Sequence, residues 1–174
     1  MSITFFNKLY KKPVSGLMKT GFLFLLAISA VSAKAQQNKL PPFRMFLETG
    51  TVFKAEQLPL GKPIVLIYFL PDCEHCQLLT QNIVKHLDEL KGFSVVMVTY
   101  YPPAEVGRFA RRYGLDKHSN FYLGTEGNFF YLKNYYNLSK LPFAALYTQN
   151  GNLIKTYNSE DFFSDFLREI KKVK

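Results

Sequence analysis

The feature that most constrains the fold is an apolar run that leads directly into both cysteines of the chain. Residues 64–70 are continuously apolar, and the motif Cys73-Glu74-His75-Cys76 follows after two residues. Such a run is typical of a strand covered on both faces, and helical spacing begins at Glu74. Cys73 is therefore expected in the first turn of a helix, where the helix end and its unpaired N–H groups favour a thiolate. Cys76 follows one turn later, so we interpret the pair as a redox dithiol.

A purely structural disulfide is the alternative for these two cysteines. A bridge across two intervening residues closes a very small loop and removes little entropy from the unfolded chain. Structural bridges in secreted domains usually connect distant segments. The spacing of Cys73 and Cys76 therefore favours thiol–disulfide exchange.

The first 35 residues have the three parts of a secretory signal peptide. A lysine-rich region precedes the apolar residues 21–33, which are too few for an ordinary membrane span. Residues 33–35 have the small-x-small pattern that predicts cleavage after Ala35, and Met18 is a second candidate start. A buried helix or an uncleaved anchor is the alternative. We predict export and a periplasmic or otherwise extracytoplasmic location.

The net charge depends strongly on this segment. Residues 1–35 contain five lysines and no acidic residue, so their removal lowers the formal charge from +9 to +4. The remaining basic residues are scattered, whereas a nucleic-acid surface needs a dense basic stripe. We therefore expect no nucleic-acid partner. Residues 36–42 are predicted to be a flexible leader, and residues 43–174 suit a single domain.

The pattern of apolar residues predicts an α/β fold with a mixed central sheet, helices on both faces and an N-terminal β extension. Strands are expected at residues 43–47, 51–54, 64–69, 93–100, 143–147 and 153–157, with a strand end at 121–123. Helices are expected at residues 74–90, 104–113 and 128–136 and, capped by 158–161, at the C-terminus. The strand–helix–strand order around the cysteines predicts a parallel pair.

For two of these helices the sequence also predicts which residues face the core. The inner face of the first is predicted to contain Leu78, Leu79, Ile83, Val84, Leu87 and Leu90. That of the last is predicted to contain Phe162, Phe163, Phe166, Leu167 and Ile170. The aromatic residues between positions 121 and 136 are expected to pack in the core rather than to bind a ligand.

These residues resemble the thioredoxin-like superfamily, and most closely its exported TlpA/ResA-type branch. The resemblance rests on the strand that enters Cys73–Cys76, on Leu141-Pro142-Phe143 and on the hairpin at residues 146–154. Residues 43–66 also resemble the N-terminal extension of that branch, so the similarity covers residues 43–172. It implies a three-layer thioredoxin-like sandwich.

The resemblance also implies a mechanism and its partners. Pro142 would be a cis-proline beside the dithiol, which leaves the backbone of Leu141 to pair with a substrate chain. Cys73 would attack a disulfide and Cys76 would resolve the mixed disulfide. The partners would be thiols or disulfides of proteins or of small molecules. The branch points to the reducing direction. We also expect a membrane or periplasmic electron donor and a monomer. No cofactor or metal is assigned.

The sequence departs from the family pattern around the dithiol. Asp72 stands where these families often carry tryptophan, and Ile67 stands where thioredoxins have a buried acid. Asp72 and Glu74 are expected to face solvent. Glu74 and His75, the two residues between the cysteines, are expected to tune the redox couple in opposite directions through their charges.

Two other functions remain open at this point. Cys73, His75 and Cys76 could bind copper or zinc with His86 or His118, although a closed zinc site usually takes a ligand pair from a second segment. Alternatively, the chain could be a redox-silent binding module that keeps only the fold.

Overall fold

The computed structural model describes residues 38–159 and 161–174. The predicted signal peptide at residues 1–35, the candidate start at Met18 and the first two residues of the leader lie outside the described residues. The described chain from residue 38 onward belongs to a single compact unit.

The chain forms seven strands and several helices over the described residues. The strands are β1 (Arg44–Phe46), β2 (Val52–Lys54), β3 (Ile64–Tyr68), β4 (Ser94–Thr99), β5 (Phe121–Thr125), β6 (Phe143–Tyr147) and β7 (Leu153–Tyr157). The α-helices are α2 (Glu74–Lys85), α3 (Leu87–Leu90), α4 (Pro103–Tyr113), α5 (Tyr131–Tyr135) and α6 (Phe163–Val173). Short 3-10 helices are η1 (Ala55–Gln57), η2 (Leu115–Lys117) and η3 (Gly127–Phe129).

All seven strands belong to one mixed sheet in the order β2-β1-β5-β4-β3-β6-β7. Strands β3, β4 and β5 are parallel, whereas β6 and β7 form an antiparallel hairpin beside β3. The N-terminal hairpin β1–β2 joins the sheet through the pair Phe46 and Thr125. The predicted mixed sheet with a parallel β-α-β unit and an N-terminal β extension is confirmed.

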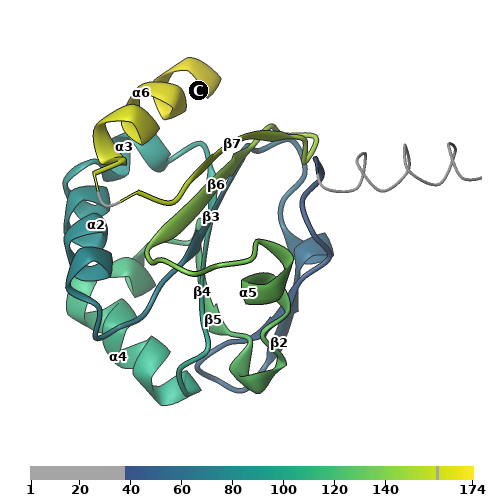
Figure 1. Ribbon diagram of the computed structural model, residues 1–174, viewed down its shortest axis with the longest axis vertical. Helices are drawn as coiled ribbons and strands as arrows, with labels where there is room; N and C mark the ends of the chain where they lie inside the picture. The colour runs from purple at the N-terminus through teal and green to yellow at the C-terminus, as the bar shows by residue number, and fades with distance from the viewer. Residues whose placement is uncertain (1–37, 160) are drawn as a thin grey trace, which may run out of the picture. The chain divides into compact units, whose positions relative to one another are not determined.

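The two faces of the sheet carry separate apolar clusters. On one face, Val65 and Ile67 of β3 pack with α2, α3, α4 and α6. On the other face, Leu66 and Tyr68 pack with α5 and with residues of β1 and β2. Figure 1 shows this arrangement, with α2 and α4 on one side of the strands and α5 on the other. Alternate residues of β3 therefore supply two cores, as expected of a central strand.

The prediction of one continuous helix at residues 74–90 is wrong. Helix α2 ends at Lys85, and His86 has φ −124° and ψ 29°. In a continuing helix the amide of His86 would bond to the carbonyl of Asn82, but the His86 ring Nδ1 lies 2.9 Å from that oxygen. The amide bonds to Ile83 instead, and α3 begins one residue later.

The predicted inner face of this helix also needs one correction. Leu78 is 48% exposed, whereas Leu79, Ile83 and Cys76 are buried. The buried stripe is therefore narrower than the apolar pattern suggested, because the buried positions of α2 follow one line of three- and four-residue steps that leaves Leu78 to one side.

The region between residues 121 and 136 differs from the prediction in its boundaries. Instead of a strand end, β5 is a full strand between β4 and β1. The predicted helix at residues 128–136 is shorter, because Phe130 adopts φ +48° and separates η3 from α5. Of its aromatic residues, Phe129 is 61% and Tyr131 41% exposed, so these two do not pack in the core as expected.

The start of α6 differs from the predicted cap at residues 158–161. Phe162 occupies the N-cap position and makes no side-chain capping bond. Its ring is buried between Tyr157 and Phe166, so apolar packing fixes this helix start. Phe166 and Ile170 are buried as predicted, and Phe163 and Leu167 are partly exposed. No helix among residues 38–159 and 161–174 is long and apolar enough to cross a membrane.

Candidate active site

The motif Cys73-Glu74-His75-Cys76 lies where β3 passes into α2. Strand β3 is buried along its whole length, and Phe69 extends it by bonding its N–H to the carbonyl of Val98. The chain then turns, with the Cys73 N–H bonded to the Leu70 carbonyl, and Cys73 becomes the N-cap residue of α2. A rigid central strand thus fixes Cys73 at a helix N-terminus, as the sequence predicted.

The two sulfur atoms are close to each other but differ in burial. The Cys76 N–H donates to Cys73 Sγ at 3.4 Å, so the first turn of α2 directs one backbone donor at that sulfur. Cys73 is partly exposed, whereas Cys76 is fully buried, and both are free thiols. Cys73 is therefore the sulfur that an incoming disulfide can reach.

The environment of Cys76 favours its protonated form. Burial raises the pKa of the Cys76 thiol well above its ordinary value, and the interaction with Cys73 raises it further. The backbone N–H of Leu70, 3.5 Å from the Cys76 sulfur, opposes this shift only in part. Cys76 is thus held as a thiol beneath Cys73.

Leu141 and Pro142 lie beside the dithiol. Their peptide bond is cis, as the resemblance implied, and the carbonyl oxygen of Leu141 is 4.0 Å from Cys73 Sγ. Pro142 is buried and leads into β6, which pairs with β3 so that Phe143 lies opposite Tyr68. The pairing of β3 with β6 therefore brings residues far apart in the sequence to the same edge as Cys73.

Glu74 and His75 are both exposed on the first turn of α2. His75 lines a cavity of about 340 Å³ together with Pro142, Leu78 and Phe163, and this cavity separates the start of α2 from the start of α6. The exposed Leu78 side chain therefore lies on the same surface as the dithiol. The redox tuning assigned to Glu74 and His75 stays a prediction.

Asp72 is exposed, as predicted, but it has a partner that the sequence did not reveal. The hydroxyl of Tyr101 donates to Asp72 Oδ2 at 2.5 Å. This bond raises the pKa of Tyr101 to about 12, because the hydroxyl must keep its proton beside a carboxylate. Tyr101 follows β4, so the parallel pairing of β3 and β4 places the two side chains together.

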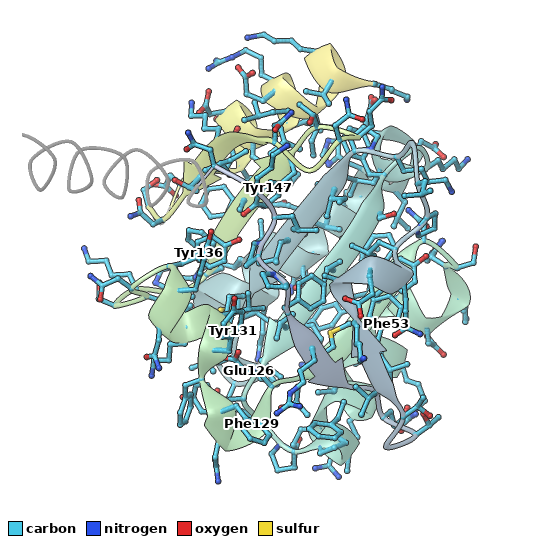
Figure 2. The ribbon with its side chains drawn as sticks, turned by 90° about the vertical axis from the view of Figure 1, so that its right-hand side faces the viewer. Phe53, Glu126, Phe129, Tyr131, Tyr136 and Tyr147 are labelled. Carbon is cyan, nitrogen blue, oxygen red and sulfur yellow. The ribbon has the colours of Figure 1, made fainter. Side chains whose placement is uncertain are left out.

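Among the described residues, the buried acid is Glu126, and it lies on the face of the sheet opposite to Cys76. Ile67 is fully buried in the apolar cluster of α2, so no acid occupies that position. Glu126 is instead 2% exposed and accepts bonds from the Tyr68 hydroxyl at 2.6 Å and the Leu132 N–H at 2.7 Å. Figure 2 shows Glu126 between Tyr131 and Phe129, two exposed aromatic residues of this face. Its position after β5 carries no pattern that could have identified it in the sequence.

The histidines considered as metal ligands lie on different elements of the fold. His86 ends α2, where its ring packs against Phe163, and His118 follows η2, where its ring packs against Phe121. Within residues 38–159 and 161–174, no group of three or more His, Cys, Asp or Glu side chains has the arrangement of a metal site.

Comparison with solved structures identifies the fold. A secreted disulfide oxidoreductase of Mycobacterium tuberculosis, described as homologous to DsbE of E. coli, superposes with a TM-score of 0.59 at 20% identity, over 74% of this chain and 96% of that one. The DsbF protein of the same organism gives 0.63 at 18% identity over 80% and 98% of the two chains. The chain has a thioredoxin-like fold.

A third solved structure has the same fold. A SCO1/SenC family lipoprotein from Bacillus anthracis str. Ames superposes with a TM-score of 0.63 at 20% identity, over 79% of this chain and 95% of that one. No protein-family model matches the sequence, and no curated protein matches it. At these identities the likeness establishes the thioredoxin-like fold, and the chemistry has to be argued from the site.

Proposed function

We propose that this protein is an extracytoplasmic thiol–disulfide oxidoreductase that works through Cys73 and Cys76. The observation that carries the proposal is the contrast between the two sulfurs. Cys73 is accessible at a helix N-terminus, and Cys76 is buried as a thiol one turn later. An attacking sulfur needs access, whereas a resolving sulfur needs only proximity to the first.

The reaction transfers two electrons and two protons to the substrate. The Cys73 thiolate attacks one sulfur of a substrate disulfide, which breaks that bond and forms a mixed disulfide. Cys76 then gives up its proton and attacks Cys73 Sγ, so the mixed disulfide breaks and the Cys73–Cys76 bond forms. Both substrate sulfurs leave as thiols. The reverse sequence would oxidise a substrate dithiol.

The segment at Leu141 and Pro142 would position the substrate. The Leu141 carbonyl is next to Cys73 Sγ, so a substrate chain that pairs with the Leu141 backbone would have its cysteine at the attacking sulfur. Leu141 and Pro142 are therefore the proposed substrate-binding residues. Protein disulfides and small-molecule disulfides are both suitable substrates for such an exposed site.

Glu74 and His75 are proposed to adjust the redox couple without taking part in the exchange. Both are exposed next to the cysteines. A cationic His75 would stabilise the Cys73 thiolate and make the couple more oxidising, and Glu74 would act in the opposite sense. We propose the reducing direction, with electrons supplied by a membrane or periplasmic donor.

The location proposed for this activity follows from the sequence. Residues 1–35 form the proposed signal peptide, residues 36–42 the leader and residues 43–174 the thioredoxin-like domain. Several proteins of the same fold are named as secreted or as lipoproteins. We propose that the exported protein acts as a monomer.

Insulin reduction by the purified protein tests the proposal. Wild-type protein should reduce insulin disulfides with dithiothreitol as electron source, and Cys73→Ser should abolish turnover. Cys76→Ser should accumulate a mixed disulfide, because the resolving thiol is missing. Copurified stoichiometric copper or zinc without thiol turnover would instead indicate a metal carrier. If both serine variants behave like wild type in every redox assay, the chain is a binding module.

A further inference from the structure

The loop before Cys73 is held in place from two sides. On one side, Gln77 Nε2 of α2 donates to the carbonyl of Pro71 at 2.8 Å. On the other side, the Tyr101 hydroxyl donates to Asp72 at 2.5 Å. Tyr101 is itself fixed, because its N–H bonds to the Thr99 hydroxyl at the end of β4. The carboxylate of Asp72 therefore has a defined position next to the dithiol.

The charges around Asp72 leave its negative charge without a cationic partner. Asp72 and Tyr101 line a cavity of about 720 Å³ together with three arginines of α4. Two of these arginines have other partners, since Arg108 pairs with Glu105 and Arg111 pairs with Glu48. Within the described part of the chain, no salt bridge includes Asp72. Its partner is the neutral hydroxyl of Tyr101.

A fixed carboxylate at this position acts on the two oxidation states differently. Reduction replaces the uncharged disulfide by two sulfurs, and at alkaline pH, where thiols ionise, a nearby negative charge destabilises the thiolate and with it the reduced protein. The charge of Asp72 is one of the causes that raise the pKa of Cys76. The disulfide carries no charge, so Asp72 affects it less.

We propose that Tyr101 is a positioning residue that fixes the Asp72 carboxylate beside Cys73, and that this charge makes the dithiol a stronger reductant. The inference rests on the proposed function, because it concerns the same redox couple. It assigns an electrostatic role to Asp72, the residue before Cys73.

The equilibrium with glutathione measures this effect on the purified protein. Two glutathione thiols reduce the Cys73–Cys76 disulfide to two thiols and become one glutathione disulfide, so two electrons and two protons are transferred. At pH 9, where ordinary thiols ionise, Asp72→Asn should shift the equilibrium constant about three- to tenfold toward the reduced protein, which corresponds to a potential about 15 to 30 mV higher. Asp72→Glu, which keeps the charge, should recover most of the wild-type value.

The same glutathione equilibrium also tests the role of Tyr101. Tyr101→Phe should shift the equilibrium in the same direction by less, because the carboxylate remains but is free to move away. The double variant Asp72→Asn with Tyr101→Phe should match Asp72→Asn alone, since Tyr101 acts only through Asp72. Asp116→Asn, which removes an exposed carboxylate of η2 beyond the C-terminal end of α4, should leave the constant unchanged.

Each alternative outcome has a separate meaning. If Asp72→Asn has the wild-type equilibrium constant, the electrostatic role of Asp72 is wrong. Additive shifts in the double variant, or an unchanged constant in Tyr101→Phe, would overturn the positioning role of Tyr101. If wild-type protein forms no Cys73–Cys76 disulfide at any glutathione ratio, the proposed function fails and the inference fails with it.

Discussion

Glu126 and Cys76 are buried on opposite faces of the sheet, and the two groups are held very differently. Glu126 accepts bonds from the Tyr68 hydroxyl and from the N–H groups of Leu132 and Lys133. Cys76, on the other face, has only a 3.5 Å contact from the Leu70 N–H and the neighbouring sulfur of Cys73. A carboxylate with three donors is a structural anchor. A buried thiol whose main neighbour is another thiol is suited to form a bond with it.

The first prediction compares how substitutions on the two faces affect activity. Cys73→Ser should lower insulin reduction to the uncatalysed background, because a serine hydroxyl does not carry out disulfide exchange. Glu126→Gln should retain turnover near the wild-type rate, because Glu126 belongs to the opposite face. A large loss of turnover in a folded Glu126→Gln protein would contradict this separation.

The second prediction concerns stability on the Glu126 face. Glu126→Ala should lower the free energy of unfolding by about 3 kcal/mol, since it leaves the Tyr68 hydroxyl and two backbone N–H groups without their acceptor. Urea unfolding measures the loss. Glu56→Ala removes an exposed carboxylate and should change the stability by less than about 0.5 kcal/mol. Equal effects of the two substitutions would show that Glu126 is not an anchor.

The third prediction concerns the pH dependence of the dithiol face. Because the pKa of Cys76 is raised in the folded protein, its contribution to stability is present below the ordinary thiol pKa and is lost as pH rises above it. Between pH 9 and 10 the reduced protein should lose about 1 kcal/mol more than Cys76→Ala, in which this titration is absent. Urea unfolding at both pH values measures the difference. Parallel pH profiles for the two proteins would rule out a buried thiol.

The fourth prediction again concerns the face that carries Glu126. The hydroxyls of Tyr136 and Tyr147 are hydrogen-bonded to each other, and Figure 2 shows the two side chains meeting. Burial raises the pKa of both, that of Tyr147 to about 12. Tyr136→Phe should cost about 1 kcal/mol in urea unfolding, because the Tyr147 hydroxyl loses its partner. Tyr131→Phe on the exposed rim is the matched control, and an equal loss there would contradict the assignment.

The sequence predicted the parts of the site that depend on local order and on family resemblance. A buried strand followed by helical spacing was enough to place Cys73 at a helix N-terminus, because both patterns are contained in a short stretch of chain. The cis bond before Pro142 was implied by resemblance alone. The hairpin of β6 and β7 followed from the Asn150-Gly151 turn signal.

The missed features depend on contacts between distant segments. Tyr101 and Asp72 are 29 residues apart, and Glu126 and Tyr68 are 58 residues apart. No periodicity links such pairs, because strand order and register bring them together. The end of α2 at His86 was missed for a different reason, since a side chain competes there with the backbone for one carbonyl.

A glutathione titration of the wild-type protein, with the Cys73–Cys76 disulfide detected by thiol labelling and mass, is the most direct test of the central claim. The claim predicts a reversible two-electron couple within one chain, nearer to the reducing end of the range of about −270 to −120 mV known for related dithiols. Cys73 and Cys76 that remain unlinked at every glutathione ratio would contradict it.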